Sequence, residues 1–208
     1  MIVYLHSPDV PDAGRTFERH KDLTDVIHII INENYSVPQI VQEVIRRVRQ
    51  PRSIWLLIFN AHGNSGTIHL GRGIGILNVT ELSPLAPYMT LGGKGVEIHS
   101  CLVASSVTSS EANAGHSGEY DIHRDPAVDR VDLIRTTPGM TNLGMTFIEY
   151  MAASLNVPIR GGMDYQIGQQ TATFGGSIGD TEGVFEGPWV TVWPNGAATQ
   201  HDPSQAPH

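Results

Sequence analysis

The chain alternates between apolar runs and amphipathic segments, and this alternation predicts its secondary structure. Residues 2–5 (IVYL) are apolar and residues 25–32 (DVIHIIIN) are rich in β-branched side chains, so we expect a strand in each segment. Between residues 36 and 50, apolar residues recur every three or four positions, which predicts an amphipathic helix that begins at Ser36. Residues 53–60 (SIWLLIFN) are apolar without alternation, as expected of a strand covered on both faces.

The same pattern continues through the second half of the chain. Residues 67–77 contain two short apolar stretches that are expected to pair as a hairpin, and residues 78–89 are expected to form a short or irregular helix. Residues 95–100 (GVEIHS) predict a further strand. Residues 141–156 have apolar side chains four apart, which predicts a helix that leads into residues 157–162. The glycine-rich sequence beyond is expected to hold late strands and turns.

The order of these elements predicts a fold class and a domain. Strands that alternate with helices predict an α/β protein, a three-layer α-β-α sandwich with a mainly parallel central sheet. A chain of 208 residues with 40% hydrophobic content is expected to form one domain, over residues 1–195. Within it, residues 104–140 are rich in Ser, Gly, Asp and His and are interpreted as an inserted polar loop. The polar, proline-containing residues 196–208 are expected to be a flexible tail.

Charge and composition exclude several classes of partner. The formal net charge of -8 argues against binding to nucleic acid, because a phosphate backbone repels carboxylates. No stretch approaches the roughly 20 apolar residues of a membrane span. The first ten residues lack a basic region followed by an apolar one, so no secretory signal is predicted. The cytoplasm is therefore the default location, and export by a signal-independent route stays open.

Chemically useful residues follow two of the predicted strands. His62 and Gly63 come just after residues 53–60, and Cys101, the only cysteine, comes just after residues 95–100. Because sites in open α/β sheets form beyond the carboxyl ends of the strands, these residues are expected to converge. A thiolate beside an imidazole is an activated nucleophile, and the N–H groups of Gly63 and Cys101 are suited to hold a developing oxyanion. The arrangement indicates acyl-transfer chemistry.

Two sequence blocks carry a resemblance to a known family. LLIFNAHGNSGTIHLG (56–71) followed by GVEIHSCLVASS (95–106) resembles the caspase-like (clan CD) cysteine peptidases, and the match looks closest to poorly characterised bacterial caspase-like and CHAT-type domains. The resemblance spans roughly residues 50–195. It departs from many members of the family where a long polar segment follows CLVASS. It suggests a bacterial origin.

The resemblance implies a thiol protease with a catalytic dyad. His62 would be the general acid and base, Cys101 the nucleophile, and the amides of Gly63 and Cys101 the oxyanion hole. The reaction would cleave a peptide bond of a protein or peptide substrate through a thioester acyl-enzyme, without a cofactor or metal. In this family a charged side chain in the first pocket selects the residue before the cleaved bond. Asp164 is the candidate for that substrate-binding role and would favour Arg or Lys, with a cap or turn residue as its alternative.

Two other functions remain open on the sequence alone. Free cysteine is among the most often buried residues, so Cys101 as a packing residue would leave a catalytically inactive caspase-like domain that binds a partner protein. A metal-dependent hydrolase would use His62, His69, His99 and acidic residues such as Glu97. The alternation in residues 95–100 puts His99 on the same side as Glu97, where packing or a hydrogen bond is expected for it.

Overall fold

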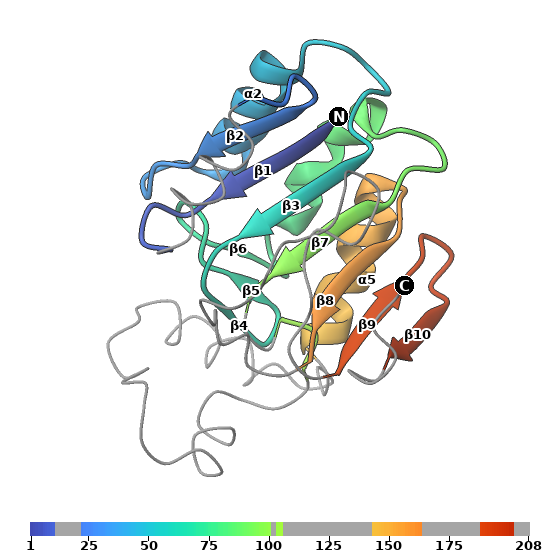
Figure 1. Ribbon diagram of the computed structural model, residues 1–208. Coiled ribbons are helices and arrows are strands. Elements are labelled where there is room, and N and C mark those ends of the chain that lie inside the picture. Colours follow the sequence, from blue (N-terminus) through green and yellow to red (C-terminus); the bar gives the residue numbers. More distant parts are fainter. Residues whose placement is uncertain (11–21, 101–102, 106–142, 164–187, 202–208) are drawn as a thin grey trace.

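A seven-stranded sheet forms the centre of the protein (Figure 1). The structure, a computed structural model, describes residues 1–10, 22–100, 103–105, 143–163 and 188–201. The strand order is β10-β9-β8-β7-β3-β1-β2. The strands are β1 (Ile2–His6), β2 (Val26–Ile30), β3 (Leu56–Asn60), β7 (Gly95–His99), β8 (Ile159–Gly162), β9 (Trp189–Val192) and β10 (Ala198–His201). The neighbouring strands β2, β1, β3, β7 and β8 are all parallel, whereas β9 and β10 are added antiparallel. This confirms the predicted α/β class and the mainly parallel sheet.

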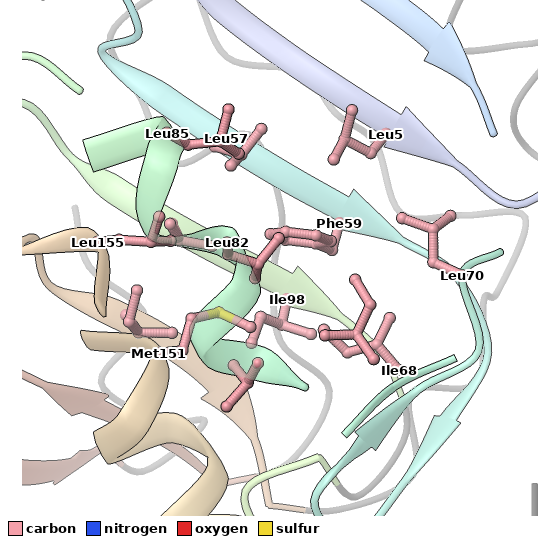
Figure 2. Packing of buried hydrophobic residues seen from close by; sticks show 14 of the residues in the cluster. Leu5, Leu57, Phe59, Ile68, Leu70, Leu82, Leu85, Ile98, Met151 and Leu155 are labelled. Carbon is pink, nitrogen blue, oxygen red and sulfur yellow. The ribbon is translucent and has the colours of Figure 1, made fainter. Parts of the chain in front are cut away.

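The described helices lie together on one face of this sheet. They are α2 (Val37–Val48), the 3-10 helix η1 (Val79–Tyr88) and α5 (Leu143–Leu155), and all three are behind the sheet in Figure 1. Their apolar residues share one buried cluster with alternate strand residues, including Leu57 and Ile98 (Figure 2). The opposite face has a smaller buried cluster, formed by Ile2, Tyr4, Leu56 and Ile58. The expected three-layer sandwich needs helices on both faces, and the described residues supply them on one.

Local sequence explains how two of the helices form. At the start of α2, the Ser36 N–H donates to Gln39 Oε1 at 2.8 Å, so the predicted N-cap is in place. Two prolines inside η1, Pro84 and Pro87, remove backbone donors, and the segment is a 3-10 helix rather than a regular α-helix. This agrees with the irregular helix predicted there.

A small second sheet follows β3 and lies beyond the carboxyl ends of β3 and β7 (Figure 1). It consists of β4 (Gly63–Asn64), β5 (Thr67–Ile68) and β6 (Ile74–Gly75) in an antiparallel arrangement. The hairpin of β5 and β6 was expected from the sequence, and β4 adds a third strand to it. Ile68 and Leu70 are fully buried against the main cluster (Figure 2), so this small sheet is fixed to the core.

The C-terminal segment differs from the flexible tail expected from the sequence. Residues Ala198–His201 form β10, which pairs with β9. The reversal between the strands uses Gly196, whose φ of 82° is readily adopted by glycine, and the His201 ring stacks on Trp189 with 3.7 Å between ring centroids. A polar, proline-containing composition does not reveal such a non-local aromatic contact. Residues 202–208 lie outside the described part of the chain.

Candidate active site

The sheet brings the two predicted strand ends to the same edge. β3 and β7 are parallel neighbours, and their last residues, Asn60 and His99, are register partners. His62 and Cys101 each follow two residues later in the chain. Cys101 itself lies outside the described residues. The geometry of the site is therefore described from the residues that flank Cys101 and His62.

The two strand ends touch through Gly63 and Ser100. A Cβ atom on Gly63 would lie 2.8 Å from Ser100 Cβ and 2.8 Å from the carbonyl oxygen of Thr67, so only glycine fits there. The buried Ser100 hydroxyl donates to the carbonyl oxygen of Ala61 at 2.7 Å. The residue before His62 is thus hydrogen-bonded to the residue before Cys101.

The chain is fixed again just after Cys101 and Leu102. The Gly66 N–H donates to the carbonyl oxygen of Val103 at 3.1 Å, and the Ala104 N–H donates to that of Gly162, at the end of β8, at 3.0 Å. The Ser65 hydroxyl donates to the carbonyl oxygen of Ser105. Ala104 and Ser105, the first residues of the expected polar loop at 104–140, are buried. Residues 106–142 lie outside the described part.

His62 presents its ring at the surface of this edge. Its side chain is 52% exposed, and its backbone carbonyl accepts the N–H of His69 at 2.8 Å. The ring nitrogen Nε2 is 4.0 Å from Oδ2 of Asp9, which follows β1 and is also exposed. An exposed imidazole on a fixed backbone is accessible to a substrate and available for proton transfer.

Asn64, two residues after His62, is a buried amide without visible partners. The side chain belongs to a residue that is 4% exposed, and neither Oδ1 nor Nδ2 has a hydrogen-bond partner among the described residues. Such orphaned polar atoms are rare in folded proteins, and each one calls for an explanation. The amide lies in β4, in the small sheet that follows His62.

Polar side chains of β3, β1 and β2 also lie close together on the sheet face opposite the described helices. Asn60 Nδ2 lies 3.1 Å from His6 Nδ1, and His6 Nε2 lies 2.8 Å from His28 Nδ1. Because an amide nitrogen only donates, His6 accepts from Asn60 and donates to His28. On β7, His99 Nε2 is 3.2 Å from Glu97 Oε2, so the expected hydrogen bond of His99 on the side of Glu97 is confirmed.

The remaining predicted site residues have different outcomes. Asp164 lies outside the described residues, so its substrate-binding role stays a prediction. Within the part of the chain that the structure describes, no group of three or more His, Cys, Asp or Glu side chains is arranged to hold a metal ion, and this includes the set around His62, His69, His99 and Glu97.

None of the described helices is long and apolar enough to cross a membrane.

Sequence reasoning missed Asp9, Ser100 and Asn64. For Asp9 a signal was present, since Ser-Pro-Asp follows the first strand directly and the carboxyl ends of neighbouring parallel strands share an edge. The sequence did not single out Ser100. Its bond to Ala61 joins residues 39 positions apart, and no local pattern indicates it.

Comparisons of the chain with models of known families, with curated proteins and with solved structures find no match. The likeness to caspase-like peptidases is therefore carried by the His-Gly and Cys blocks of the sequence.

Proposed function

We propose that this protein is a cysteine endopeptidase of the caspase-like type, with Cys101 as nucleophile and His62 as general acid and base. The observation that carries the proposal is the contact of Gly63 with Ser100, together with the bond from the Ser100 hydroxyl to the Ala61 carbonyl. The hydrogen bond joins the residue before His62 to the residue before Cys101, and the contact brings the residue after His62 against the same serine. A three-layer caspase-like sandwich and a cytoplasmic location are part of the same proposal.

The chemistry follows from the residue types. The Cys101 sulfur attacks the carbonyl carbon of a peptide bond, and the N–H groups of Gly63 and Cys101 stabilise the oxyanion. His62 takes the thiol proton and gives it to the departing amine, which leaves a thioester. Water then attacks the thioester with His62 as base, which releases the acid and restores the thiol. Asp164 would line the pocket for a basic side chain of the substrate.

The proposal is tested by covalent labelling of the folded protein. We expect peptidyl acyloxymethyl ketones with varied first-pocket residues to label Cys101, as located by mass spectrometry of peptides. Because general acid–base assistance contributes about 100-fold or more, His62→Ala should slow labelling by that order. Since Cys101 is the only cysteine, Cys101→Ala removes every thiol and gives the blank.

His99→Gln is the matched control, since His99 is also a histidine at a strand end but is hydrogen-bonded to Glu97. Labelling should persist in this variant and in the presence of a chelator. Labelling that is no faster than that of heat-unfolded protein or a free thiol would contradict the peptidase and favour the inactive, partner-binding alternative. Chelator-sensitive hydrolysis would instead favour the metal-dependent alternative.

A further inference from the structure

Asp9 lies in a tight turn that is fixed to the strand leading to His62. The Val10 N–H donates to the carbonyl oxygen of Ser7 at 3.3 Å, which closes a four-residue turn. Pro8 occupies its second position, where the fixed φ of proline favours turns. The Ser7 N–H donates at 3.0 Å to the carbonyl oxygen of Asn60, the last residue of β3. The turn is therefore hydrogen-bonded to the end of the strand that leads to His62.

The two oxygens of the Asp9 carboxylate have different neighbours. The hydroxyl of the buried Ser7 donates to Oδ1, and Oδ2 is the oxygen nearest His62, 4.0 Å from Nε2. Both side chains of this ion pair are more than half exposed, and exposed pairs contribute little to stability.

We infer that Asp9 is a positioning residue for His62, an inference that rests on the proposed function. At 4.0 Å the pair is too long for a hydrogen bond, but the negative charge of Asp9 favours the neutral imidazole that carries its proton on the nearer nitrogen, Nε2. Nδ1 then holds the free electron pair. When Cys101 reacts, its S–H bond breaks and an N–H bond forms at Nδ1, and the resulting imidazolium faces the negative charge of Asp9.

The experiment reads the proton position directly. Full-length protein with ¹⁵N-labelled histidine is studied by NMR at about pH 8, where a free imidazole is neutral, and the His62 signals are assigned with His62→Gln. We expect the fraction of the Nε2–H form to be higher in the wild type than in Asp9→Ala. Asp25→Ala is the matched control: Asp25 is another exposed aspartate, and it precedes β2 at the amino end of the sheet.

Labelling of Cys101 supplies the second readout. Asp9→Ala should slow labelling by about 10-fold, part of the contribution of general acid–base catalysis, while Asp25→Ala leaves it unchanged. Ser7→Ala, which frees Oδ1, should show a smaller loss in the same direction. Both measurements use the native, full-length chain.

The outcomes separate this inference from the proposed function. An identical distribution of the His62 proton in wild type and Asp9→Ala overturns the positioning role, as does equal labelling of the two when the wild type reacts. A wild type that is not labelled, but whose His62 proton shifts in Asp9→Ala, overturns the peptidase and supports the pairing of Asp9 with His62.

Discussion

The lack of a side chain at position 63 determines how closely two strand ends approach. Gly63 lies against Ser100 and Thr67, and this contact joins segments that are far apart in sequence. The sequence predicted His62 and Gly63 at a strand end, because a long apolar run stops there. It did not predict the contact with Ser100, since packing between distant residues leaves no periodic signal along the chain.

Gly63→Ala should destabilise the protein and slow labelling of Cys101. The new methyl group would lie 2.8 Å from two heavy atoms, one of them a backbone oxygen, so the strand ends must separate. Overpacking of this kind costs about 1–3 kcal/mol in the free energy of unfolding. Urea unfolding measures the loss, and the labelling rate measures the effect on the site.

Gly75→Ala is the control in the same small sheet. There a Cβ atom would lie 3.6 Å from Thr67 Oγ1, an ordinary contact, so stability should change by less than about 1 kcal/mol. Equal effects of the two substitutions would show that the tight fit of Gly63 against Ser100 is not important.

Among the elements, strands and helices with a clear apolar period were predicted well, and elements set by distant partners were not. α2 and α5 lie within their predicted segments because their apolar faces repeat along the helix. β10 was missed because its four residues, Ala198–His201, are mostly exposed and polar, and β9 supplies its hydrogen bonds. The layer of helices on one face also depends on tertiary packing rather than on local pattern.

The β9–β10 hairpin should make stability depend on pH through His201. Burial, and secondly the nearby positive charge of Arg160, lower the pKa of His201 below its usual 6.5. The unfolded chain then binds a proton more readily than the folded one. The stabilisation is fully present above about pH 6.5 and is lost as the pH falls through the folded pKa.

Urea unfolding of the wild type and His201→Gln at about pH 7.5 and pH 5.5 checks this expectation. The wild type should lose more stability between the two values than the variant, because the variant lacks the titrating ring. The chain has ten histidines, so the difference between the two proteins is the informative quantity. An equal loss in both would contradict a role for His201.

The molecule as a whole is held by one large apolar cluster, and this suggests that it unfolds as a unit. The cluster contains residues of α2, η1 and α5 and of the neighbouring strands β2, β1, β3, β7, β8 and β9, so its members span the sheet. A single domain was expected from length and hydrophobic content, but those quantities carry no information about which elements share a core. Sheet order and the antiparallel addition of β9 and β10 likewise depend on the path of the chain in three dimensions.

Phe147→Ala tests this cooperativity, with Tyr150→Ala as control on the same helix. Phe147 is fully buried on α5, and its removal should cost about 3–5 kcal/mol, whereas Tyr150 is 44% exposed and its removal should cost far less. Far-UV circular dichroism reports on the helices and strands. Tryptophan fluorescence reports on the C-terminal hairpin through Trp189 and Trp193 and on the residue before β3 through Trp55. If the cluster makes the sheet and helices unfold together, the transitions followed by circular dichroism and by fluorescence coincide in the wild type. Both transitions then shift together in Phe147→Ala. Transitions that separate would show that the C-terminal hairpin unfolds apart from the helices, and the site edge would then be stabilised by β3, β7 and the small sheet alone.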